Sequence, residues 1–310
     1  QLSDRLITAI KNAIKESISK IAKARPLPEE LEGKKVWLDP AFKSLLVPGN
    51  DRSVSDNTYR LPCGSRIDVS DENKDVVRFF THWKNQDTDK GDYWHTGRVH
   101  IDLSAHFLNA DFSYVRELSW RNQYDSNKFH AAFSGDITDA PKGAAEFIDI
   151  NYKKLRDAQP NLKYVVIANN VFTGQDYADI PECFSGVMLR EKCGKYGEIF
   201  EASTVKTKFD LKQKGAAQNI ACVLDLDTME LIYIDKPQDR AQSCRVAGAN
   251  FNAISMTIKR ILQPQMSLYE LIECELDLVE NKEDADFIIS DSEDSNLKSW
   301  ESDKITKYFL

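Results

Sequence analysis

The chain has 310 residues, of which 42% are hydrophobic and 10% are aromatic, and this composition is that of a folded protein rather than a disordered one. Its length allows one large domain with appendages, or two domains. The formal net charge of -8 argues against a nucleic-acid partner, because binding to phosphates requires clustered Lys and Arg.

The first predicted element is a helix from Leu2 to Ala24, in which apolar residues recur at helical spacing and Lys and Arg occupy the other face. A basic amphipathic helix can lie on an anionic membrane, but this one lacks the Trp and Phe that usually mark the apolar edge of such helices. We therefore expect it to dock on its own domain or on a partner protein. Pro26 and Pro28 end the helix, so residues 1–34 form a helix with a linker.

Short segments rich in β-branched and aromatic residues follow, separated by Gly, Asn, Asp and Pro. The predicted strands are Lys35–Asp39, Asp75–Trp83, Arg98–Leu103, Tyr164–Asn170, Gly186–Arg190, Ala221–Asp225 and Leu231–Asp235. Many short strands with few helical periods predict a mainly β domain, a sandwich or barrel, over residues 35–240. In one strand, Val99, Ile101 and Leu103 alternate with His100 and Asp102. This pattern predicts a half-exposed strand in which the side chains of His100 and Asp102 point outward.

Residues 241–310 are predicted to form a small helical or α/β appendage. Ser267 and Glu270 have the spacing of a capping box at the start of a helix. The expected elements are a helix that begins after Arg245 and ends at Pro264, helices at Leu268–Cys274 and Trp300–Phe309, strands at Leu276–Val279 and Phe287–Ile289, and an acidic loop at Asp291–Asn296.

The six cysteines are scattered and never occur as C-x-x-C, which favours free thiols in a reducing compartment over a disulfide framework. There is no apolar run long enough to span a membrane and no signal peptide, so we expect a cytoplasmic location. The chain begins with Gln1 rather than Met, which indicates a trimmed protein that further domains can precede. The sequence does not indicate an oligomeric state.

Several enzyme signatures are missing from the sequence, among them the P-loop, the dinucleotide-binding glycine motif, the nucleophile elbow and H-E-x-x-H. The histidines His82, His95, His100 and His106 crowd one region, and three of them could line a zinc site. Because their spacing matches no recurrent ligand pattern, we expect them to be surface or interior packing residues instead.

The segment Ser134–Ile150 places Asp136, Asp139, Glu146 and Asp149 around a turn rich in Gly and Pro. Calcium prefers several oxygen ligands from such a flexible loop. An ordinary acidic connection between strands, with Asp136 and Asp139 capping turns, fits the composition equally well.

Two motifs, HIDLSAHFL from His100 and SGDITDAPKGAAEFIDI from Ser134, resemble those of the tellurium-resistance TerD family. Further matches follow in the same order: YVVIANNVFTG from Tyr164, CFSGVMLRE from Cys183 and GKYGEIFEA from Gly194. The resemblance covers about Val76 to Asp235, and a long bacterial subgroup of the family fits best. It implies an antiparallel β-sandwich, a calcium site, and a role in bacterial stress or tellurite-type resistance.

Carried over residue by residue, the resemblance implies Asp102, Asp136 and Glu146 as calcium ligands, and chemistry alone adds Asp139. This sequence departs from the family at His100, which replaces an Asp, and at Ile137, which replaces an Asn. Ala144 and Ala145 stand where acidic residues are expected, and the loop is one residue shorter. Fewer carboxylates predict a lower affinity for calcium or a changed selectivity.

The leading functional hypothesis is a non-catalytic, calcium-binding interaction or scaffold protein with a protein partner. A metal-free scaffold with a degenerate site comes close behind it. A metal-dependent hydrolase ranks below both, because it would need a general base, for which only His100 and His106 are near. Whether the protein is an enzyme is left open, with the non-catalytic hypothesis preferred.

Overall fold

The computed structural model describes residues 4–46, 61, 63–86, 97–122, 124–125, 128–193, 202–239, 251–262, 266–298, 301, 304 and 308. The chain divides into two compact units. The larger unit comprises residues 50–58 and 63–263, and the smaller combines residues 1–49, 59–62 and 264–310. The two ends of the chain therefore fold together, whereas the sequence-based division at residues 34 and 240 had kept them apart.

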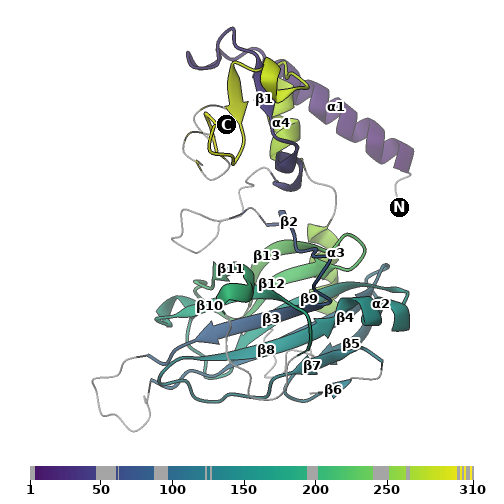
Figure 1. The fold of residues 1–310 in the computed structure, drawn as a ribbon, viewed down its shortest axis with the longest axis vertical. Coiled ribbons are helices and arrows are strands. Elements are labelled where there is room, and N and C mark those ends of the chain that lie inside the picture. The colour runs from purple at the N-terminus through teal and green to yellow at the C-terminus, as the bar shows by residue number, and fades with distance from the viewer. Residues whose placement is uncertain are drawn as a thin grey trace. The chain divides into compact units, whose positions relative to one another are not determined.

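The larger unit is a β-sandwich, as predicted (Figure 1). One sheet contains β3 (Val76–Trp83), β6 (Tyr124–Asp125), β7 (Ala131–Phe133), β8 (Ala144–Asn151), β10 (Cys183–Arg190) and β11 (Val205–Asp210). The other contains β2 (Arg66–Asp68), β4 (Ile101–Asn109), β5 (Tyr114–Leu118), β9 (Leu162–Val171), β12 (Ala216–Asp225) and β13 (Glu230–Asp239). Their orders are β11-β10-β3-β8-β7-β6 and β2-β13-β12-β9-β4-β5, and all neighbouring strands are antiparallel.

The core lies between the two sheets, because alternate residues of each strand point to the same face. Its largest cluster joins side chains from both sheets, among them Val77, Phe79, Leu103, Phe107, Ile148, Ile150, Val165, Ile167, Val187 and Leu224. The inward direction of Leu103 agrees with the alternation predicted for this strand.

The outer face of the second sheet is also covered. Helix α3 (Phe251–Ile261) packs Ile254 and Ile258 against Val166 and Ile220 of the sheet. Strand β4 is buried over almost its whole length, and the prediction of a half-exposed strand was wrong. His100 and Asp102 lie on the outer face but are only 6% and 5% exposed.

Short helical segments connect the strands of the sandwich: α2 (Tyr152–Ala158), η2 (Tyr177–Asp179) and η3 (Ala202–Thr204). Among the described residues, no helix is both long enough and apolar enough to cross a bilayer. Of the helix predicted at residues 300–309, only 301, 304 and 308 belong to the described residues.

The smaller unit contains α1 (Asp4–Ala22), β1 (Val36–Leu38), η1 (Pro40–Ser44), α4 (Leu268–Glu275), η5 (Lys282–Asp284) and β14 (Phe287–Ile289). The predicted capping box at Ser267 and Glu270 is present at the start of α4. Strand β1 pairs in parallel with β14. The prediction that this segment belongs to the sandwich was therefore wrong. Residues 276–279, predicted as a strand, contribute a single bridge from Leu278 to Val36.

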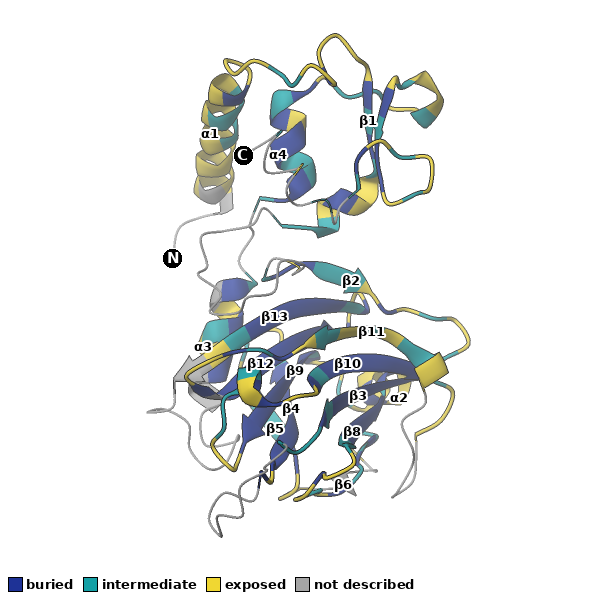
Figure 2. Cartoon of the chain, turned by 90° about the vertical axis from the view of Figure 1, so that its left-hand side faces the viewer, coloured by how far each residue is buried: buried dark blue, intermediate teal, exposed yellow. Residues whose placement is uncertain are grey.

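Helix α1 packs on α4 through one polar face. Lys15 Nζ lies 2.7 Å from Glu273 Oε2, and Ser19 Oγ donates a hydrogen bond to the Cys274 carbonyl at 2.9 Å. The opposite side of α1 is exposed along much of its length (Figure 2). Its large apolar residues Leu6, Ile10, Ile14 and Ile21 are 45%, 43%, 52% and 61% exposed. We call these four residues the apolar stripe of α1.

Candidate metal site at the edge of strand β4

The site is built where β4 is paired on one side only. Strand β9 pairs with β4 along its length, whereas β5 pairs only with the stretch from Ala105 to Leu108. The backbone before Ala105 therefore has groups that must bond elsewhere. The Leu103 amide donates its hydrogen bond to Glu146 Oε2 at 2.9 Å.

Glu146 also holds the loop that passes this edge. The segment Ser134–Ile150 was predicted as one loop, but only its first part connects β7 to β8, and Glu146 and Asp149 lie within β8. The second carboxylate oxygen of Glu146 accepts a hydrogen bond from the Ile137 amide at 2.9 Å. One buried carboxylate thus fixes the residue after Asp102 and the residue after Asp136.

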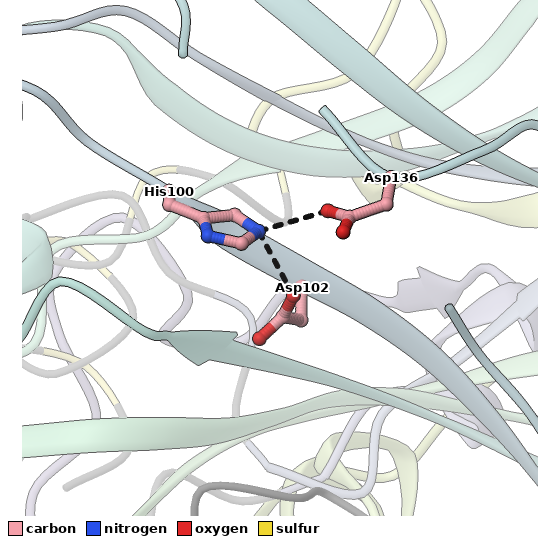
Figure 3. A group of neighbouring side chains, drawn as sticks. All are labelled: His100, Asp102 and Asp136. Carbon is pink, nitrogen blue, oxygen red and sulfur yellow. Dashed lines mark hydrogen bonds and ion pairs between the residues drawn. The ribbon is translucent and has the colours of Figure 1, made fainter. Parts of the chain in front are cut away.

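Glycine allows the loop its sharp turns. Gly135 has φ +114° and Gly143 has φ +84°, both in the region that favours glycine. The turn at Gly135 precedes Asp136, whose side chain points back to β4 (Figure 3).

Three side chains converge at this point. Figure 3 shows the ring of His100, which directly precedes β4, with its Nε2 directed to Asp102 of β4 and to Asp136 of the loop. Nε2 lies 3.1 Å from Asp102 Oδ1 and 2.9 Å from Asp136 Oδ1. The three potential ligand atoms lie within 4.8 Å of one another, and among the described residues this is the one such group of His, Cys, Asp or Glu. Asp136, with a side chain 33% exposed, is on the solvent side, whereas the other two are nearly buried.

Two ionisable groups at the site have shifted pKa values. Burial by itself lowers the pKa of His100, but the hydrogen bond to Asp102 and the charges of Asp102 and Asp136 outweigh it and raise the pKa. Burial raises the pKa of Glu146 well above its usual range, and the negative charges of Asp102 and Asp136 raise it further. The hydrogen bonds from the Ile137 and Leu103 amides lower the pKa but do not cancel these effects. A cation at this position would relieve the repulsion among the three carboxylates.

Asp102 and Asp136, two of the predicted ligands, lie together in the structure. Glu146 lies beside them, but both of its oxygens accept backbone hydrogen bonds. Asp139 points elsewhere: it is exposed, and its Oδ1 accepts a hydrogen bond from Asn85 at 2.8 Å. His100 was considered as a general base and as one of several histidines for a zinc site, but it was missed as a partner of Asp102 and Asp136. Its position two residues before Asp102 was the available signal, because strand residues two apart share a face.

His82 and His106 lie apart from this group. His106 is fully buried next to Ser104, and burial lowers its pKa to about 4. His82 lies 3.5 Å from Glu182 and stacks on Phe184. His95 lies outside the described residues. The three-histidine zinc site considered from the sequence is therefore not formed by His82, His100 and His106.

The donor set can be compared with what calcium requires. Calcium takes 6–8 oxygen ligands, whereas the cluster offers two carboxylates and one imidazole nitrogen. Asp102 and Asp136 fit a calcium site, while His100 does not supply an oxygen. The three residues together are a suitable ligand set for a divalent cation. Only the two aspartates suit calcium, which takes oxygen ligands.

No protein-family model matches the sequence, and no curated protein matches it. Among solved structures, a homologue of the telluride resistance protein TerD from Streptomyces coelicolor aligns with a TM-score of 0.41 and 11% identity, covering 59% of this chain and 98% of the other. A protein of unknown function aligns with a TM-score of 0.39 and 12% identity, covering 55% of this chain and 94% of the other. At these scores and identities neither likeness establishes a relationship, so the function is inferred from the residues of this chain.

Proposed function

We propose that the protein is a non-catalytic interaction and scaffold protein whose sandwich binds a divalent cation at the edge of β4. The observation that carries the proposal is the convergence of His100, at the start of β4, and Asp102 of β4 with Asp136 from the loop. A cation held there would link two elements and order the surface around them. The resemblance of the sequence motifs implies calcium as the ion and bacterial stress or tellurite-type resistance as the setting. The scattered cysteines and the missing signal peptide favour the cytoplasm as the compartment.

The surroundings of the cluster support binding rather than catalysis. A hydrolase would need a general base, and His100 Nε2 already contacts both carboxylates of the cluster. His106 is fully buried against Ser104. Phe172, by contrast, is 53% exposed and its ring centroid lies 5.2 Å from that of His100. An exposed aromatic side chain beside an ion site suits a contact with a partner protein.

The metal-free scaffold is the second candidate, and one observation favours it. A protonated His100 would supply a positive charge between Asp102 and Asp136. The raised pKa of His100 favours this protonated form. The histidine would then replace the cation in joining the strand to the loop.

Calorimetric titration of calcium into metal-stripped protein tests whether calcium is the ion. If calcium is the ion, we expect saturable heat that Asp136→Ala abolishes, because this removes one of two charged oxygen ligands. Asp139→Ala is the matched control, because Asp139 lies on the same loop and contacts Asn85 instead. Absence of heat for the parent protein up to millimolar calcium would rule out calcium as the ion.

The apolar stripe of α1 supports the proposal of a protein partner. At 3.6 residues per turn its four residues fall within an arc of about 80°. On the same geometry Lys11 and Lys20 flank the stripe, each about 90° from its centre. An apolar face that is about half exposed and has basic flanks suits an amphipathic helix of a partner that carries Glu or Asp beside its own apolar residues.

Substitution of Ile10 and Ile14 by serine tests this proposal. We expect the thermal stability of the smaller unit to stay within about 0.5 kcal/mol per site, because both side chains are already exposed. Binding to a synthetic amphipathic peptide with glutamate flanks, measured by fluorescence anisotropy, should be lost. The matched control is the same peptide with lysine flanks, which the parent protein should not bind. Co-sedimentation of the parent protein with anionic vesicles, abolished by the double substitution, would instead indicate a membrane surface.

A further inference from the structure

We propose that the cluster of His100, Asp102 and Asp136 selects a transition-metal ion of the Zn²⁺ type over calcium. The inference rests on the cation site proposed above and concerns which class of ion that site takes. It is carried by the identity and position of one residue, His100, whose imidazole nitrogen stands between the two carboxylates.

The chemistry of the ligands favours such an ion. Imidazole nitrogen is a preferred ligand of Zn²⁺ and related metals, whereas calcium and magnesium take oxygen. The carboxylates that could enlarge an oxygen shell are engaged elsewhere, since Glu146 bonds backbone amides and Asp139 bonds Asn85. One nitrogen, two carboxylate oxygens and a water molecule complete the four ligands that Zn²⁺ takes.

The distances are close to those required. Ligand atoms about 2.0–2.1 Å from a tetrahedral zinc ion lie about 3.3 Å from each other. His100 Nε2 is already 2.9 Å and 3.1 Å from the two carboxylate oxygens, so these two pairs need to separate by only a few tenths of an ångström, and the two carboxylate oxygens lie within 4.8 Å of each other. The ion would take the place of the proton that Nε2 now shares with the carboxylates, and that proton would pass to water.

The cluster also has an open side. The side chains of His100 and Asp102 are 8% and 6% exposed, while that of Asp136 is 33% exposed. An ion can therefore enter past Asp136, and a water ligand can occupy this side. The two carboxylates together match the charge of a divalent ion, which lowers the cost of holding them close to each other.

Paired titrations of Zn²⁺ and Ca²⁺ into metal-stripped protein, with binding followed by a competing chromophoric chelator, test the inference. The parent protein and all variants should carry Cys193→Ser, because Cys193 is an exposed thiol and thiolates are common zinc ligands. We expect one zinc ion per chain and weaker binding of calcium. Co²⁺ in place of Zn²⁺ should show the visible absorption of a tetrahedral site with nitrogen and oxygen ligands.

His100→Asp is the decisive variant, because it exchanges the nitrogen for oxygen. We expect zinc affinity to fall by at least about 100-fold, since even groups that only support a metal ligand contribute 10–100-fold. Calcium affinity should rise in the same variant. His82→Gln is the matched control and should leave both affinities unchanged, because His82 contacts Glu182 and Phe184 instead. If His100→Asp does not fold, Asp136→Asn removes a ligand from the more exposed position.

The outcomes separate this inference from the proposed function. Tighter binding of calcium than of zinc by the parent protein, or zinc binding that both His100→Asp and Asp136→Asn leave unchanged, would overturn the inference. In the first case the cation-binding function would stand. Binding of neither ion would overturn both and leave the metal-free scaffold.

Discussion

Replacement of Glu146 with alanine is expected to lower the free energy of unfolding of the sandwich by about 2–4 kcal/mol. The carboxylate is fully buried and accepts hydrogen bonds from the amides of Leu103 and Ile137. Without it, two backbone donors lose their acceptor, each at a cost of about 1–3 kcal/mol, while reduced repulsion with Asp102 and Asp136 offsets part of the loss. In a domain of this size the melting temperature should fall by roughly 5–15 °C.

Thermal unfolding together with hydrogen exchange of individual amides measures this effect. The amides of Leu103 and Ile137 should exchange faster in Glu146→Ala than in the parent protein. Glu146→Gln keeps one acceptor oxygen, so its exchange rates and melting temperature should lie between those of Glu146→Ala and the parent protein. Asp139→Ala should leave the melting temperature unchanged, since its side chain is exposed. If Glu146→Ala instead abolishes metal binding with no loss of stability, Glu146 is a ligand, as first predicted, and not a support for the two aspartates.

The second large effect concerns Arg78 and Asp149, which form a buried ion pair on β3 and β8. Arg78 Nη2 donates to Asp149 Oδ2 at 2.7 Å, Nε bonds the other carboxylate oxygen, and the guanidinium lies over the Phe147 ring. Both residues are at most 3% exposed. Arg78→Met should destabilise the sandwich by about 3–5 kcal/mol, because a buried carboxylate then loses its guanidinium.

The double variant Arg78→Met/Asp149→Leu is the informative companion in denaturant unfolding experiments. Replacement of a complete buried ion pair by apolar side chains is often neutral or stabilising, so most of the lost stability should return. A coupling energy close to zero between the two sites would show that Arg78 stabilises the sheet through packing on Phe147 and not through the ion pair.

Strong local signals predicted much of the sandwich. The apolar and β-branched runs of β3, β9 and β10 mark strands that are buried on both faces, and such runs are clear in a sequence. Strand β8 was taken for a loop because Pro141 and Gly143 precede it and Ala144 and Ala145 open it. Strand β1 was recognised, but a local pattern does not say which strand it pairs with, and its partner β14 is near the other end of the chain.

The site was predicted less completely for a related reason. Asp102 and Asp136 were identified through sequence motifs, and Asp139 was added because carboxylates in a loop suit calcium. Which carboxylates meet depends on hydrogen bonds between segments far apart in the sequence. Asn85 binds Asp139 and turns it from the cluster, while Glu146 is held by the amides of Leu103 and Ile137. Composition alone contains neither fact.

The joining of the two chain ends in one unit has a consequence for synthesis on the ribosome. Helix α1 meets α4 through Lys15 and Glu273, which are 258 residues apart. At 5–20 residues per second, α1 waits roughly 13–50 s for its partner helix, while every strand of the sandwich is made in the interval. During that time the helix has both its α4-binding face and its apolar stripe uncovered. Helix α1 is therefore open to chaperones until α4 has been made, and it reaches its final packing only after the strands of the sandwich.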